Sequence, residues 1–370
     1  MKLSRAQCFL YPVSYGLTDL RGREFETGTL DHVFLKLTAD DGAVGWGEGF
    51  GYCAAAATFA ALVQIVTPML EGLDVESPEQ TFDYLSRACH QAGLAGPVLY
   101  ARAAVDIALW DLHARRKACP LHSILGSATG SNLPAYSSLF RYDDADLVAA
   151  KCKDRASKGY GAVKLHEVRP EVVAAARRGL GSDPKLMLDA NCAWSKSEAI
   201  SLIQEMCENQ LFWVEEPVFP PDDVDALAAV HAATGQRLAA GENAAPALEF
   251  SALAEAGQVD ILQPSITKIG GVTPMLRLLR ECQEHGRQVA LHSPYFGPGL
   301  LATMHVFVAT DQSLMVEYYD ADRLSGLPYG DVLAPTNGCI VLPNGNGLGL
   351  ASQEDVIFAS ASARRDIFYD

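Results

Sequence analysis

Short apolar runs recur along most of the chain, and each is followed by a polar or ionisable residue and then by a segment with helical spacing. The residues at the ends of these runs are Lys164 with His166, Asp189, Glu215, Glu242, Ser265, His292 and Glu317. Counted from Lys164, the intervals are 25, 26, 27, 23, 27 and 25 residues. This length fits one buried parallel strand, one covering helix and two loops. The period predicts a (β/α) barrel that begins near residues 133–138, with the ionisable residues together at the carboxyl ends of its strands.

The pattern before residue 127 is different. Residues 31–38 and 43–48 alternate on either side of Asp41-Gly42, which predicts a β-hairpin, and residues 54–70, 78–92 and 97–117 have helical spacing. The segment from Gly16 to Gly28 is rich in glycine and charge and predicts a loop. These elements predict an α+β capping domain over residues 1–126, a barrel over 127–326, and a Gly/Pro-rich segment over 327–370 that returns to the cap.

Two of the predicted barrel helices have legible starts. Ser195 and Glu198 form a capping-box pattern, and Thr273 followed by Pro274 predicts a side-chain cap with proline in the first turn. Both starts fall where a helix should follow a strand of the repeat.

Composition narrows the class of protein. The net charge of −16 and the pI near 5.0 argue against a nucleic-acid groove or an anionic membrane surface as partner, since either needs a basic face. Nine cysteines occur without a Cys-x-x-Cys pair, which predicts reduced thiols. The first residues lack the apolar core of a signal peptide, so we expect a cytoplasmic protein.

Several motifs resemble one family. They are the stretch from Ala101 to Gly126 with Asp106, Trp110 and Asp111, followed by Leu188-Asp189-Ala-Asn191, Trp213-Val-Glu215-Glu216-Pro217, Gly241-Glu242-Asn243 and Ile269-Gly270-Gly271-Val-Thr273. Together they resemble the mandelate racemase/muconate lactonizing enzyme branch of the enolase superfamily, over nearly the whole chain. The resemblance implies an α/β fold of the modified TIM-barrel type, (β/α)₇β, with an N-terminal α+β capping domain completed by the C-terminal segment. It also implies Mg²⁺ and removal of the proton α to a substrate carboxylate.

Asp189, Glu215 and Glu242 end three successive strands and supply only carboxylate oxygens, a set that suits a hard octahedral cation. We therefore predict that they bind Mg²⁺. The alternative is that each merely caps the next helix. Asn191, Glu216 and Asn243 lie beside them in sequence and are candidates for supporting contacts. Lys268 either supports the metal carboxylates or contacts solvent at a helix start.

Lys164 and His166 are two residues apart on one strand and should point to the same face. The resemblance implies Lys-x-Lys here, with the first lysine at the substrate carboxylate and the second as base. His166 stands in place of the second lysine, and imidazole is a sound base near neutral pH. The resemblance also places another histidine at His292 and a substrate-binding carboxylate at Glu317.

Ser265 stands where the resembling family has an aspartate that orients the strand-seven histidine. A serine hydroxyl can orient His292 but supplies no charge to stabilise its imidazolium form. Two equal bases are what a racemase needs, so this difference favours dehydration, with His166 removing the α-proton, Lys164 assisting, and His292 protonating the departing hydroxyl.

The expected function is thus Mg²⁺-dependent dehydration of an acid sugar, an aldonate or aldarate, by a homo-oligomeric enzyme. Racemisation or epimerisation and cycloisomerisation are alternatives in the same family, and a catalytically silent acid-sugar-binding or scaffold protein is an alternative of another class. Specificity should come from the cap, through the 16–28 segment with Arg21, Arg23 and Glu24 and through residues 47–52.

Overall fold

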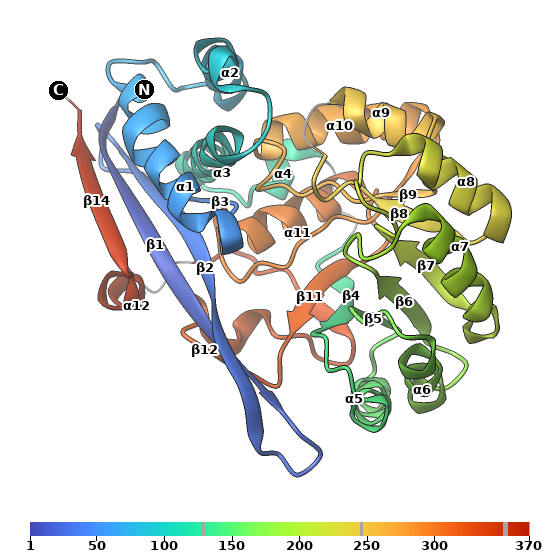
Figure 1. Cartoon of the computed structure of the whole chain (residues 1–370). Helices are drawn as coiled ribbons and strands as arrows, with labels where there is room; N and C mark the ends of the chain where they lie inside the picture. Colours follow the sequence, from blue (N-terminus) through green and yellow to red (C-terminus); the bar gives the residue numbers. More distant parts are fainter. Residues whose placement is uncertain (127–129, 245–246, 351–353, 370) are drawn as a thin grey trace.

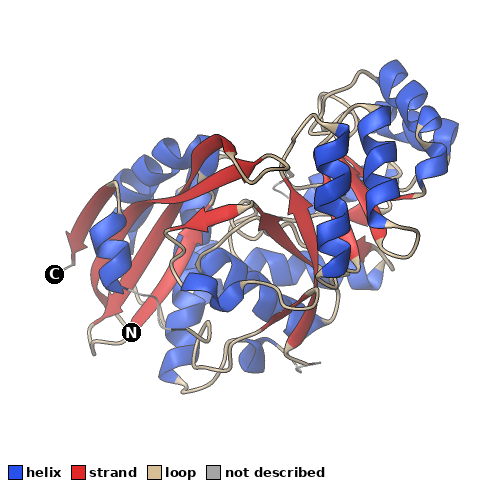
Figure 2. Cartoon of the chain, turned by 90° about the horizontal axis from the view of Figure 1, so that it is seen from below, coloured by secondary structure: helices blue, strands red, loops and turns tan. Residues whose placement is uncertain are grey.

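The computed structural model describes residues 1–126, 130–244, 247–350 and 354–369, in two joined parts (Figure 1). The predicted boundary between cap and barrel falls at residues 127–129, which lie outside the described residues. Figure 2 shows the strands of the cap gathered on one side of the molecule and the helices that cover the barrel strands on the other. Within these described residues the two sheets have five and nine strands.

The barrel alternates strands and helices as the period predicts. Its strands are β4 (Asn132–Leu139), β5 (Ala162–Leu165), β6 (Lys185–Asp189), β7 (Leu211–Glu215), β8 (Leu238–Ala240), β9 (Ile261–Leu262), β10 (Gln288–Val289) and β11 (Val316–Asp320). The helices between them are α5 (Ala145–Ser157), α6 (Pro170–Leu180), α7 (Lys196–Glu205), α8 (Val224–Thr234), α9 (Ala247–Glu255), α10 (Val272–Glu284) and α11 (Pro298–Thr310). Neighbouring strands pair in parallel, and a bridge between Val289 and Ser313 closes the ring. The predicted (β/α)₇β barrel is confirmed.

The cap is built on an antiparallel sheet. Its elements are β1 (Leu3–Thr18), β2 (Glu24–Ala39), β3 (Val44–Gly49), α1 (Ala55–Ala61), α2 (Pro78–Ala88), α3 (Pro97–Arg116) and the short α4 (His122–Leu125). The hairpin at Asp41-Gly42 is present between β2 and β3, and a π-turn and a 3₁₀ turn continue α1 to Leu70. By length and composition the stretch Tyr52–Leu70 could cross a membrane, but its buried side chains pack into the core of the cap.

The prediction of a loop from Gly16 to Gly28 is wrong. Only residues 19–23 turn, because β1 and β2 stay paired to the register Thr18–Glu24 and form a long hairpin that projects beyond the rest of the cap (Figure 1). The glycines do not break the strands, since the continuous ladder of backbone hydrogen bonds holds them extended.

The C-terminal segment returns to the cap. β12 (Arg323–Ser325) and β14 (Ala363–Phe368) both pair with β1, β12 near its end and β14 near its start, and α12 (Glu354–Ser360) lies between them in sequence. This return begins at Arg323, inside the segment that the sequence assigned to the barrel. β13 (Cys339–Val341) instead pairs with barrel strand β4.

The cap lies against the barrel through β3 and α3. Glycines 45, 47 and 49 occupy one face of β3, where any Cβ would collide with backbone oxygens of α3, so only glycine lets this helix approach so closely. The alternate residue Glu48 points the other way and accepts a hydrogen bond from the Gly299 N–H at the start of α11 (2.7 Å). The cap thereby contacts the first turn of α11, the helix that follows β10.

Candidate active site

The candidate site rests on a layer of side chains that fills the barrel. One residue comes from each strand position, namely Tyr136, Ala162, Met187, Trp213, Ala239, Ile261, Ala290 and Met315. Two residues further along each strand, and therefore on the same inward face, are Ser138, Lys164, Asp189, Glu215, Gly241, Gln263, His292 and Glu317. The polar layer thus lies directly above an apolar floor.

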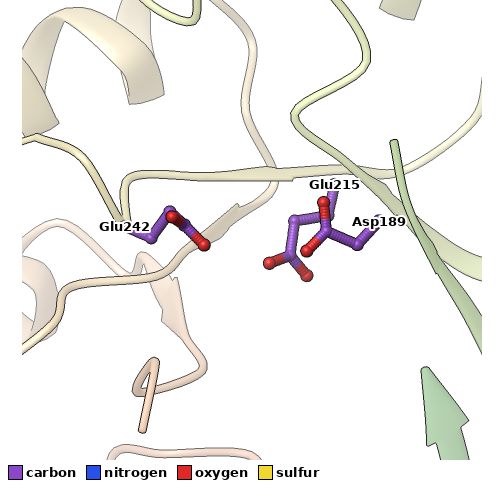
Figure 3. A group of neighbouring side chains, drawn as sticks. All are labelled: Asp189, Glu215 and Glu242. Atoms are coloured by element: carbon purple, nitrogen blue, oxygen red, sulfur yellow. The ribbon is translucent and has the colours of Figure 1, made fainter. Parts of the chain in front are cut away.

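Asp189, Glu215 and Glu242 come together at one point. Each offers a carboxylate oxygen, and these oxygens all lie within 4.8 Å of one another. In Figure 3 Asp189 and Glu215 lie side by side and Glu242 faces them. Glu242 is one position beyond the layer, because Gly241 has φ +123°, a conformation that redirects the next residue inward.

Lys164 lies among the carboxylates. Its ammonium group is 2.9 Å from Glu215, 3.0 Å from Glu317 and 3.2 Å from Asp189, and the side chain is buried. Burial alone would lower the pKa of Lys164, but the surrounding carboxylates raise it well above its usual value. Lys164 is held here as a cation.

The carboxylates differ in their surroundings. Burial and the charge of Asp189 raise the pKa of Glu215 well above its usual value. Burial also works against the charge of Glu242, yet His292 and Lys268 hold its pKa well below the usual range. The structure thus gathers four carboxylates, of Asp189, Glu215, Glu242 and Glu317, around two lysines, Lys164 and Lys268, which is a setting that a divalent cation stabilises.

His166 is fixed by one hydrogen bond. Its Nδ1 is 2.5 Å from the carbonyl oxygen of Leu139, and its Nε2 lies 3.3 Å from Asp189. Since a carbonyl oxygen only accepts, Nδ1 carries the proton, and in the neutral ring Nε2 bears the lone pair that faces the site.

His292 is placed differently. Its Nε2 is 3.0 Å from Glu242 and 4.0 Å from Glu317, while its buried Nδ1 has no partner among the described residues. The expectation that Ser265 orients this ring is wrong, because the Ser265 hydroxyl bonds the phenol of Tyr295 instead. The two rings are thus held through different nitrogens, His166 through Nδ1 by the Leu139 carbonyl and His292 through Nε2 by the Glu242 carboxylate.

Of the expected supporting residues, Lys268 and Asn191 contact the three carboxylates, whereas Glu216 does not. Lys268 is buried, 3.1 Å from Glu242 and 2.9 Å from the Asn243 side-chain oxygen. It therefore supports the metal carboxylates and does not contact solvent at a helix start. The backbone N–H of Asn191 donates to Asp189 (2.8 Å). Glu216 points away from the three carboxylates and accepts from Asn243 (3.2 Å); burial raises the pKa of its carboxyl to about 8.

A cavity of about 180 Å³ opens above these residues. Its walls are Phe50, Tyr52, Lys164, His166, Asp189, Asn191, Glu242, Lys268, His292, Pro294, Glu317 and Tyr319. The cap therefore contributes through Phe50 and Tyr52, within the predicted 47–52 stretch. Tyr319 was missed by sequence reasoning, although it stands two residues after Glu317 on β11 and hence on the same face.

The residues at the tip of the β1–β2 hairpin are elsewhere. Arg21 and Arg23 are exposed, Arg23 pairs with Asp19 (2.7 Å), and Glu24 is 3.7 Å from Arg323. The tip faces α5, where Asp19 and Leu20 line a separate surface hollow. The structure does not bring Arg21, Arg23 or Glu24 to the walls of the site cavity.

The donor set fits Mg²⁺. Three carboxylates converge without a thiolate or imidazole among them, and this oxygen-only set at the end of parallel strands is the ligand chemistry that a hard cation prefers. A capped barrel with such a set beside a lysine and two histidines defines a metal-assisted enzyme of the α-proton-abstracting class.

Comparison with known families agrees. Residues 147–356 match the model described as enolase C-terminal domain-like, and residues 25–126 match the N-terminal domain of mandelate racemase/muconate lactonizing enzyme. The chain belongs to the mandelate racemase/muconate lactonizing enzyme branch of the enolase superfamily.

Individual relatives are enzymes of acid sugars. The chain is 30% identical to D-galactarolactone cycloisomerase of Agrobacterium fabrum, over 88% of this chain and 90% of the relative. It is 28% identical to L-talarate/galactarate dehydratase of Salmonella typhimurium, over 74% and 70%. The solved structure of a racemase from Streptomyces coelicolor with bound magnesium superposes with a TM-score of 0.83 at 25% identity, covering 97% and 99% of the two chains.

Proposed function

We propose that this chain is an acid-sugar dehydratase, in which His166 removes the proton α to the substrate carboxylate and His292 protonates the departing β-hydroxyl. Asp189, Glu215 and Glu242 would hold Mg²⁺. When bound, the ion would supply positive charge beside the substrate carboxylate and make its α-proton more acidic. The names of the relatives support an acid sugar as substrate.

The observation that carries the proposal is the contrast between the two imidazoles. The Leu139 carbonyl holds Nδ1–H of His166 and leaves the lone pair on Nε2, 3.3 Å from Asp189, whereas His292 turns its Nε2 toward Glu242 and its Nδ1 has no orienting partner among the described residues. A racemase needs two comparable bases on opposite faces, and this site offers one fixed base. Dehydration needs one base and one acid.

The remaining groups serve the same step. As the α C–H bond breaks and its electron pair forms the C=C bond, the ammonium of Lys164 is placed to balance charge that grows on the substrate carboxylate. The β C–O bond then breaks, and the hydroxyl leaves as water with a proton from His292. His292 lines the same cavity as His166 and Lys164, with its Nε2 3.0 Å from Glu242.

Cycloisomerisation is the second candidate, because the 30% identical relative is a cycloisomerase. It shares the first step, removal of the α-proton by His166, and differs in the group that leaves. Product analysis separates the two: dehydration of a six-carbon acid gives a keto-deoxy acid and water, whereas cycloisomerisation of a lactone releases no water.

The test measures α-proton exchange in deuterated water and dehydration separately, with Mg²⁺ and a panel of aldonates and aldarates. In His292→Asn we expect exchange to survive and dehydration to fall roughly 10²–10⁴-fold, the usual contribution of a general acid. In His166→Asn both activities should be lost. The reverse pattern makes His292 the base and overturns the assignment.

A silent binding or scaffold protein is separated by the same panel, because it would exchange no α-proton with any member. A homo-oligomeric state and a cytoplasmic location stay predictions from the sequence.

A further inference from the structure

A second cavity, of about 460 Å³, adjoins the site. It shares His166, Asn191 and Tyr319 with the first cavity, and its other walls come from Glu26, Phe140, Arg141, Asp143, Ala190 and Ala193. The two hollows therefore meet at His166. A ligand whose reacting end lies at His166 extends directly into the second cavity, whose volume is ample for the rest of a six-carbon acid.

Arg141 is the cation on this wall. It follows β4, and its Nε donates a hydrogen bond to the carbonyl oxygen of His166 (2.5 Å). That bond fixes the guanidinium next to the base. Among the described residues Arg141 makes no ion pair and no further hydrogen bond, so its terminal nitrogens remain available. Arg169, by contrast, is engaged by Asp143 and Glu171.

Two carboxylates also line the cavity and would oppose an anion. Asp143 lies 3.9 Å from Arg169, which offsets its charge. Glu26 is exposed on the cap hairpin and accepts a hydrogen bond from Tyr15 (3.2 Å), so water screens much of its charge. The guanidinium that is tethered beside His166 is the better-placed charge for the far end of the ligand.

We propose that Arg141 binds a second carboxylate at the far end of the substrate. This inference rests on the proposed function and narrows its substrate class to sugar diacids, aldarates or lactones that keep a free second carboxylate, in preference to aldonates. A guanidinium pairs with a carboxylate through two parallel hydrogen bonds, whereas the terminal hydroxymethyl group of an aldonate offers only one neutral partner.

The test compares pairs of the same configuration, galactarate with galactonate and glucarate with gluconate, on the Mg²⁺-loaded full chain. For the reactive pair we expect wild type to favour the diacid at least tenfold in kcat/KM. In Arg141→Gln the loss on the diacid should exceed the loss on the monoacid at least tenfold, mainly through KM. Arg141→Lys should recover part of the preference, because it restores the charge but not the paired geometry.

Arg178→Gln is the control, since it removes an exposed guanidinium in the last turn of α6 that does not line the cavity. It should leave the diacid-to-monoacid ratio unchanged. Equal losses on both acids in Arg141→Gln would mean that this residue only supports the His166 loop, and a wild-type preference for monoacids would also overturn the proposal.

Binding separates failure of the subsite from failure of the proposed function. Calorimetry measures the affinity of both members of a pair for wild type and Arg141→Gln, whether or not they react. Tighter diacid binding that depends on Arg141, without turnover of any acid sugar, would keep the subsite and reject the dehydratase. Turnover of an acid sugar without tighter binding of the diacid through Arg141 would keep the dehydratase and reject the subsite.

Discussion

At the scale of single residues, the three carboxylates carry the prediction of metal dependence. Replacing Glu215 by Gln removes one negatively charged metal ligand. The amide oxygen of Gln can still accept the hydrogen bond from Trp213 Nε1, which is 3.1 Å long in the wild type. We expect Mg²⁺ affinity to fall at least roughly tenfold to a hundredfold, with the fold intact, because even outer contacts of a metal site are worth that much. Titration calorimetry with Mg²⁺ measures the change.

Glu216→Gln is the matched control for that substitution. Glu216 is the next residue in sequence but points to Asn243 and Cys192 rather than to the three carboxylates, so its replacement should weaken Mg²⁺ binding much less. Full activity of Glu215→Gln, or activity of the wild type in excess chelator, would contradict the metal assignment.

The convergence of these residues was predictable, whereas their individual partners were not. Parallel strands bring their carboxyl ends together, so the spacing of Asp189, Glu215 and Glu242 was enough to place them side by side. Which neighbour a short hydroxyl chooses depends on side-chain positions that no spacing encodes, and Ser265 bonds Tyr295 rather than His292. The sequence did not predict a role for Arg141, because this residue follows the end of β4 and belongs to no motif.

At the scale of elements, the start of α10 gives a prediction about pH. Asp106 on α3 is buried and accepts a hydrogen bond from the Thr273 N–H (2.9 Å). Burial raises the pKa of its carboxyl to about 7, against the hydrogen bonds from Thr273 and Val272 that lower it. The folded chain thus keeps this proton up to about pH 7, while the unfolded chain loses it near pH 4. This group therefore stabilises the fold at low pH, and its contribution is lost as pH rises to about 7.

Asp106→Asn removes the titration and keeps one oxygen to accept from the Thr273 N–H. From pH 5 to pH 8 the wild type should lose roughly 2 to 3 kcal/mol more unfolding free energy than this variant, since one pKa unit corresponds to about 1.4 kcal/mol. Urea unfolding at the two pH values measures the difference. Asp225→Asn, an exposed carboxylate in the first turn of α8, should keep the wild-type slope. Equal slopes for all three proteins would exclude Asp106 as the cause.

Element ends show where local sequence signals suffice. Ser195 and Glu198 form the predicted capping box, because both partners belong to one turn. The predicted side-chain cap at Thr273 is wrong: α10 begins after Gly271 without a side-chain cap, and the Thr273 hydroxyl accepts from Trp110 Nε1 (2.9 Å). Asp106, 167 residues away, binds the free N–H instead. Glu317 likewise does not end its strand, since pairing with β4 extends β11 to Asp320.

At the scale of the whole molecule, the barrel was predictable from its period and the pairing of distant segments was not. Every repeat buries its strand in the same way, so spacing alone gives the architecture. β12 pairs with the last residues of the 16-residue strand β1, and β14 pairs with its first half. More than 300 residues of chain separate these partners, and local sequence patterns carry no information about contacts at such a separation.

The join between cap and barrel gives the last prediction. Asp322 accepts from the Thr18 N–H on the cap hairpin (2.7 Å) and from Lys151 on barrel helix α5 (2.6 Å), and its side chain is 9% exposed. Asp322→Asn removes the negative charge that both donors contact, and it places the amide NH₂ group of asparagine against one of these donors. The free energy of unfolding should therefore fall by about 1 to 3 kcal/mol. Because Asp106 and Glu48 also link cap to barrel, we expect the two parts to unfold together.

Hydrogen exchange read by mass spectrometry tests both statements at once. Peptides from β2 in the cap and β6 in the barrel should lose protection by the same factor in Asp322→Asn, since both report one global opening. Asp19→Asn is the control: Asp19 pairs with Arg23 within the exposed hairpin turn, so its replacement should leave protection in both strands unchanged. Loss of protection confined to β2 would mean that the cap opens by itself, and that the contacts through Asp106 and Glu48 do not make the cap and the barrel one cooperative unit.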